Sequence, residues 1–130
     1  MRRIRTMDDI AEGLSALARI DPRLQAVVTA AGDVPLRLSE PGFASLVSIV
    51  VSQQVSRASA EAIFARLCRT IDPLTPQAVR AGGAERLAEA GLSRPKQKAL
   101  LALAASIADG GLDLARLCAE PVEAAMADLV

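Results

Sequence analysis

The 130-residue chain contains no histidine, tryptophan or tyrosine and only two phenylalanines. The lack of histidine excludes Ser-His and Cys-His catalytic pairs and any metal site with an imidazole ligand. Apolar residues still make up 52% of the sequence, which excludes an intrinsically disordered chain. Alanine and leucine supply most of them, and neither has the β-branching that favours strands. The composition therefore predicts an all-α protein whose core contains few aromatic rings.

Cysteine is scarce as well, and long apolar runs are missing. Cys68 and Cys118 lie far apart, each on an apolar helical stripe, and no CxxC spacing occurs. We expect two buried, reduced thiols, with no bound metal and no cofactor. No uninterrupted apolar run approaches the ~18 residues that a membrane span requires, and the N-terminus does not resemble a signal peptide. These features predict a cytoplasmic protein with no membrane partner.

Charge of one sign does not dominate, because 15 basic residues balance 15 acidic ones. Any contact with nucleic acid must therefore depend on local basic patches. Only two lysines occur, Lys96 and Lys98, and both lie beside Arg94. Three further arginines (Arg2, Arg3 and Arg5) belong to residues 1–6, which we expect to be a disordered basic N-terminus.

Two short helices are predicted over residues 7–32. Thr6 is a suitable N-cap, and apolar residues recur at helical spacing from Ile10 onward. The pair Asp21-Pro22 signals a second helix start, with Pro22 at its first position, and Gly32 marks its end. Residues 33–40 have no period and contain proline, so they are predicted to form a linker.

Residues 41–130 are predicted to be entirely helical. The segment from Phe43 to Val51 is apolar nearly all round, which indicates a central buried helix, although its β-branched residues also suit a strand. Ser56 then caps an amphipathic helix that ends at Asp72-Pro73. Ser93 is expected to cap a further helix, and others are expected to start near Thr75, Ala84, Asp113 and Pro121. Glycines at 82–83, 91 and 110–111 lie between these helices.

Two polar segments are the candidates for chemistry. The adjacent amides of Gln53 and Gln54 lie between the apolar helix and the helix capped by Ser56, so they either bridge the junction or contact a ligand. The free N–H groups after Ser56 suit a phosphate. The cluster of Arg94, Lys96 and Lys98 opens another helix, where it either binds phosphate or forms a solvated face.

Three segments together resemble one family. They are residues 42–67 around Ser-Gln-Gln-Val-Ser, residues 87–104 with the run Gly-Leu-Ser-Arg-Pro-Lys, and Asp21-Pro22-Arg23-Leu24. In this order and at these intervals they resemble DNA-3-methyladenine glycosylase II, of the helix-hairpin-helix superfamily of base-excision DNA glycosylases. The resemblance covers residues 21–130, and the combination of the first two segments is the most specific part of it.

The resemblance implies a two-lobed helical enzyme of DNA repair. Such an enzyme flips an alkylated base out of duplex DNA and hydrolyses its N-glycosidic bond without a second, lyase activity. Residues 41–130 would form the helical barrel lobe, and residues 7–32 would be N-terminal helices of the second lobe. Gln54, beside Gln53, takes the position of the wedge that fills the hole left by the flipped base. Ser56 and its helix would lie near the DNA phosphates.

The sequence also departs from the family. No Gly-x-Gly hairpin occurs in it, and the catalytic aspartate of the family would lie beyond Val130; Asp128 matches no catalytic position. Cleavage builds positive charge on the sugar, which a fixed carboxylate must stabilise. We therefore expect residues 1–130 by themselves to be inactive. The N-terminal helices would also lack their usual partners, so we expect them to self-associate.

Two other functions compete with this one. A non-enzymatic DNA-binding module would use the helix after Ser56 in a helix-turn-helix, although Ile63 and Phe64 make that helix apolar. A plain helical interaction domain would bind no DNA at all. Steep salt dependence of duplex binding favours the former, and stable dimers without DNA binding favour the latter.

Overall fold

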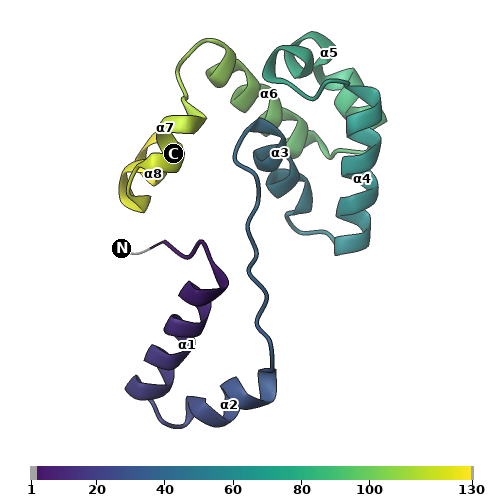
Figure 1. Ribbon diagram of the computed structural model, residues 1–130. Coiled ribbons are helices and arrows are strands. Elements are labelled where there is room, and N and C mark those ends of the chain that lie inside the picture. Colours follow the sequence, from purple (N-terminus) through teal and green to yellow (C-terminus); the bar gives the residue numbers. More distant parts are fainter. Residues whose placement is uncertain (1–2, 130) are drawn as a thin grey trace. The chain divides into compact units, whose positions relative to one another are not determined.

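The computed structural model describes residues 3–129 (Figure 1). All regular secondary structure in these residues is α-helical, so the predicted all-α fold class is confirmed. The chain divides into two compact units, one through Ser39 and one from Glu40 onward. Arg2, from the predicted basic end, and Val130 lie outside the described residues.

The first unit contains α1 (Met7–Ile20) and α2 (Leu24–Ala31). Thr6 caps α1 as predicted: its hydroxyl accepts the Asp9 N–H at 3.2 Å, and the Asp9 carboxylate accepts the Thr6 N–H at 3.0 Å. Helix α2 begins at Leu24, two residues after the predicted start, because residues 21–23 form a separate turn in which the Asp21 carboxylate accepts the Arg23 N–H at 3.0 Å. The Arg23 side chain also donates to Asp21 and lowers the pKa of that carboxyl. Residues 33–40 contain no helix or strand.

The second unit contains six helices among the described residues: α3 (Phe43–Ser52), α4 (Arg57–Thr70), α5 (Pro76–Glu89), α6 (Arg94–Ala108), α7 (Leu114–Ala119) and α8 (Val122–Leu129). Helix α6 packs on α5 and on α3, α4 contacts both α3 and α5, and α7 contacts α8. The core lies among α3–α6. Its largest fully buried side chains are Leu67, Leu87, Leu100, Val47, Val51 and Val79. Phe43 is the one buried aromatic residue among residues 3–129, so the core has few aromatic rings, as predicted.

Helix α3 is a helix rather than the strand that its β-branched residues also allowed. It buries one stripe, formed by Phe43, Val47 and Val51 at four-residue intervals. The predicted central, buried helix is buried along this stripe only, because Ile49 is 56% exposed. The reason is geometric: α4 and α6 cover the stripe, and Ile49 lies on another side of the helix.

Glycines end or break the helices where they were expected. Gly83 has a φ of 60° and interrupts α5 between the two short helices predicted there. Gly91 has a φ of 93°, and beyond it the Leu92 N–H donates to the Leu87 carbonyl at 3.1 Å. This closes the end of α5 and turns the chain toward α6.

The two cysteines are free, but they are not both buried as predicted. Cys118 is exposed, because it lies on the outer side of the two-turn helix α7. Cys68 is half-buried, and burial, with a smaller contribution from Asp72, raises the pKa of its thiol. Within residues 3–129 no helix is both long enough and apolar enough to cross a membrane.

Candidate nucleic-acid interface

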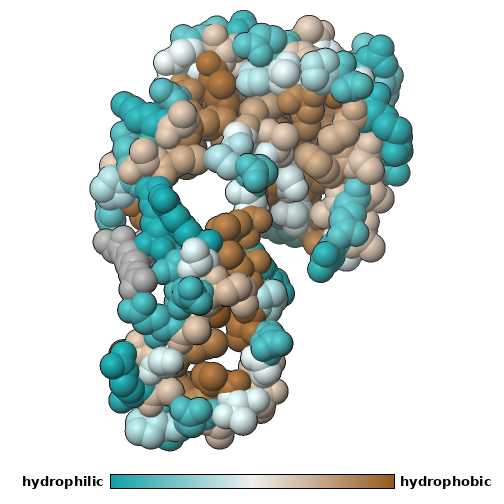
Figure 2. All heavy atoms as spheres, in the orientation of Figure 1, coloured by the Kyte–Doolittle hydropathy of each residue, from teal (hydrophilic) through white to brown (hydrophobic). Residues whose placement is uncertain are grey.

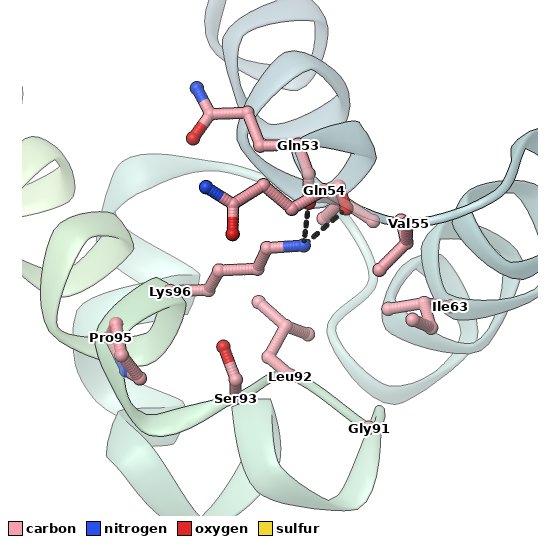
Figure 3. A pocket seen from close by; sticks show the side chains of 10 residues that line it. Gln53, Gln54, Val55, Ile63, Gly91, Leu92, Ser93, Pro95 and Lys96 are labelled. Atoms are coloured by element: carbon pink, nitrogen blue, oxygen red, sulfur yellow. Dashed lines mark hydrogen bonds between the residues drawn. The ribbon is translucent and has the colours of Figure 1, made fainter.

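The loop between α3 and α4 has an unusual backbone. Gln53 ends α3 in an extended conformation, and Gln54 then has a φ of 56°. Among residues 3–129 it is the one residue other than glycine in the left-handed region, where an L side chain crowds its own backbone. Its side chain is exposed and points away from the helix junction (Figure 3). Strain of this kind persists only where surrounding contacts hold the chain in place.

Ser56 begins α4 as predicted. Its hydroxyl oxygen accepts the Ser59 N–H at 3.2 Å, and its own O–H donates to the Ser59 Oγ at 2.9 Å. The loop that carries Gln54 therefore leads directly into a capped helix N-terminus, where the helix dipole favours negative charge.

Lys96 connects α6 to the C-terminal end of α3. Its Nζ donates to the Val51 carbonyl and to the Gln53 carbonyl, each at 2.7 Å (Figure 3). The last carbonyls of a helix lack intrahelical partners and carry partial negative charge, so an ammonium is well suited to them. The charge makes both hydrogen bonds stronger than neutral ones.

The N-terminal end of α6 lies across a pocket from this loop. Ser93 is the N-cap residue, but its side chain forms no capping bond, contrary to prediction; the Gln97 amide instead donates to the Leu92 carbonyl at 2.7 Å. The pocket has a volume of about 390 Å³. It is open to solvent, and its lining comprises Val51, Gln53, Gln54, Val55, Ile63, Gly91, Leu92, Ser93, Pro95 and Lys96 (Figure 3).

The three predicted cations of α6 separate into two groups. Lys96 is half-buried and binds the two carbonyls, whereas Arg94 and Lys98 are exposed. Within the described residues, neither the Arg94 nor the Lys98 side chain forms a hydrogen bond or an ion pair. Both are two positions from Lys96, so they project from another side of α6, and their charges are open to an anion from solvent.

The acidic side chains of residues 3–129 do not line the pocket. Between residues 3 and 129, no group of three or more acidic or cysteine side chains is arranged to hold a metal ion. Asp128, on α8, forms an ion pair with Arg116 of α7. The α3–α4 loop can contact a ligand through its exposed amides, but no carboxylate lines the pocket.

Residues 47–129 match the family model described as HhH-GPD superfamily base excision DNA repair protein. This range includes the α3–α4 loop and the three cations of α6. The chain belongs to the HhH-GPD superfamily. This confirms the superfamily inferred from the glutamine and Gly-Leu-Ser segments.

A solved structure of a DNA-repair enzyme is also similar to this chain. The chain is similar to a DNA-3-methyladenine glycosidase from Bacillus halodurans, with 27% identity and a TM-score of 0.71. The match covers 85% of this chain and 52% of that one, so the chain spans about half the length of this relative. No protein in the curated set matches the chain.

Two features of the loop were missed by sequence reasoning. The left-handed conformation of Gln54 had a weak signal, because a helix that ends without glycine leaves another residue to take that conformation. The contact of Lys96 with α3 had no signal in the sequence, because 45 residues separate Lys96 from Val51.

Proposed function

We propose that this HhH-GPD chain is part of a monofunctional DNA glycosylase that flips an alkylated base from duplex DNA and hydrolyses its N-glycosidic bond. The family and the similarity to a DNA-3-methyladenine glycosidase support this function. The observation that carries it within this chain is the exposed, left-handed Gln54.

Gln54 suits the role of a wedge for physical reasons. A flipped base leaves a gap in the stack, and a side chain that enters this gap keeps the base from returning. The amide of Gln54 can fill the space and hydrogen-bond the orphaned partner base. Because the backbone of the loop is already held in one conformation, little conformational freedom of the loop is lost when the side chain enters DNA. Gln53, exposed beside it, is assigned to the same contact.

Phosphate contacts would come from the cations of α6 and from the N-terminus of α4. Arg94 and Lys98 are exposed cations without partners among the described residues, and Ser56 opens a helix whose N-terminus attracts anions. Such contacts place the protein on the duplex and carry no sequence information. They make binding depend on salt, with each phosphate contact adding about 0.9 to the slope of log affinity against log salt.

Residues 1–130 by themselves are expected to bind duplex DNA but to release no base. Cleavage needs a carboxylate near the sugar, and no residue of this sequence matches the catalytic aspartate of the family. The test incubates the chain with methylated duplex DNA, measures free 3-methyladenine, and measures binding to a duplex with an abasic site. A longer form that carries the hairpin and the aspartate is the positive control.

Release of the base by residues 1–130 alone would show that the catalytic group lies within them. A lack of binding to abasic duplex at low salt would count against the proposed DNA site. The Gln54→Ala substitution in the longer form tests the wedge. If it releases the base at the same rate as the wild type, Gln54 is not the wedge.

Self-association through α1 and α2 stays a prediction. Their exposed apolar side chains include Met7, Leu17, Ile20 and Val27. Figure 2 shows apolar side chains, coloured brown, at the surface of the protein. Burying such side chains between copies is favourable by about 25 cal/mol per Å² of apolar surface. Light scattering at micromolar concentration is expected to give a mass above that of one chain, and Ile20→Glu is expected to lower it. A monomer for the wild-type chain would contradict the prediction.

A further inference from the structure

We propose that Lys96 is a positioning residue: it holds the α3–α4 loop in the conformation that presents Gln54, and it is not a phosphate ligand. This inference rests on the proposed function, because it names the residue that prepares the wedge. Sequence alone groups Lys96 with Arg94 and Lys98 as a candidate DNA contact. The structure separates them.

The Gln53 carbonyl links Lys96 to the backbone conformation of Gln54. The Gln53 C=O and the Gln54 N–H belong to one planar peptide group, so rotating that group changes ψ of Gln53 and φ of Gln54 together. Lys96 Nζ binds the Gln53 oxygen at 2.7 Å. A rotation that took Gln54 out of its left-handed conformation would swing this oxygen away from the ammonium.

The first carbonyl anchors the lysine itself. Lys96 Nζ also binds the Val51 oxygen at 2.7 Å, and Val51 is a buried core residue of α3. The ammonium thus connects a buried point of the helix to the peptide group beyond its end. Two charge-assisted hydrogen bonds oppose the strain of placing an L residue at a φ of 56°.

The same contacts argue against a phosphate role. An ammonium has three N–H donors, and two of them are already used by Val51 and Gln53. The Lys96 side chain is half-buried beneath the loop, whereas Lys98 is exposed two residues away. Only one N–H of Lys96 therefore remains for a phosphate, and the lining of the pocket contains no second cation to help bind one.

The experiment compares Lys96→Met with Lys98→Met in the 130-residue chain. Both substitutions remove one positive charge from the same helix and leave a side chain of similar length. Lys96→Arg keeps the charge and several donors, so it is the conservative variant. Far-UV circular dichroism establishes that each variant is folded.

The first readout uses NMR of the protein without DNA. Because only two lysines occur, the side-chain ammonium spectrum contains two signals, and the one from Lys96 is expected to exchange with water more slowly. In the wild type, Lys98→Met and Lys96→Arg, Gln54 is expected to keep the short intraresidue HN–Hα distance of a positive φ. In Lys96→Met that distance is expected to average toward extended values. An unchanged Gln54 in Lys96→Met, or two ammonium signals with equal exchange, would overturn the inference.

The second readout uses a duplex with 2-aminopurine beside an abasic site. With Lys96→Met, most of the fluorescence increase that follows unstacking is expected to be lost, while the slope of log affinity against log salt is expected to stay unchanged. With Lys96→Arg, the fluorescence increase is expected to be retained. Lys98→Met is expected to lower the slope by about 1 and to keep the fluorescence increase. A slope lowered by about 1 in Lys96→Met would make Lys96 a phosphate ligand and overturn the inference. If the wild-type chain binds no DNA, the proposed DNA site fails, whereas the NMR readout still decides whether Lys96 sets the conformation of Gln54.

Discussion

Replacing Leu100 with alanine is expected to lower the free energy of unfolding by about 2–5 kcal/mol. Leu100 lies on α6, is fully buried, and belongs to the core cluster shared by α3, α4, α5 and α6. The substitution removes its transfer free energy and leaves a cavity that rigid neighbouring helices cannot fill. Stabilities of small domains are about 5–15 kcal/mol, so this one change would remove a large share.

Urea unfolding followed by far-UV circular dichroism measures this loss. Tryptophan and tyrosine are absent, so intrinsic fluorescence offers no comparable probe. Ile49→Ala is the control, because Ile49 is 56% exposed on α3 and its truncation is expected to cost under about 1 kcal/mol. Equal losses for the two variants would contradict the core described for the second unit.

Replacing Gln54 with glycine is expected to stabilise the fold and to abolish the wedge. Glycine adopts a φ of 56° without strain, so the free energy of unfolding is expected to rise by about 1 kcal/mol. Glycine has no side chain to fill the gap left by a flipped base. The 2-aminopurine signal beside an abasic site is therefore expected to fall to the level of free DNA, while phosphate contacts preserve most of the binding.

Gln53→Gly is the matched control for this experiment. Gln53 has a φ of −63°, which any residue adopts, so glycine there adds only freedom to the unfolded chain. It is expected to destabilise the protein by about 0.5–1 kcal/mol, opposite in sign to Gln54→Gly. A loss of stability in Gln54→Gly would show that its left-handed conformation is not strained. Unstacking that survives this substitution would assign the wedge to another residue.

The helices were largely predictable because their signals are local. Thr6 and Ser56 cap the helices that they were predicted to cap, and Asp113 caps the helix that was predicted to start there. In each case a side-chain oxygen reaches an N–H only two or three residues away. A suitable residue at a helix start does not always form the cap. At the start of α6, Gln97 binds the Leu92 carbonyl and the Ser93 side chain forms no cap.

Exposure was harder to predict than helix position. The apolar run of α3 correctly indicated a helix, yet it did not show that Ile49 faces solvent, because apolarity all round a helix does not reveal which side its neighbours cover. Cys118 was misplaced for the same reason: an apolar stripe on α7 was taken as buried, and the thiol is exposed.

By itself, the sequence determined the all-α class, the helix boundaries set by caps and glycines, and the superfamily, because residue spacing and motif order record these properties directly. Only the tertiary structure decided the roles within the α6 cluster, since Lys96 turns to the α3 carbonyls while Arg94 and Lys98 face solvent. Only the structure showed that Gln54 is left-handed. The physical reason is distance along the chain: the Lys96 contact joins residues 45 positions apart, and such a contact forms only after the helices have packed.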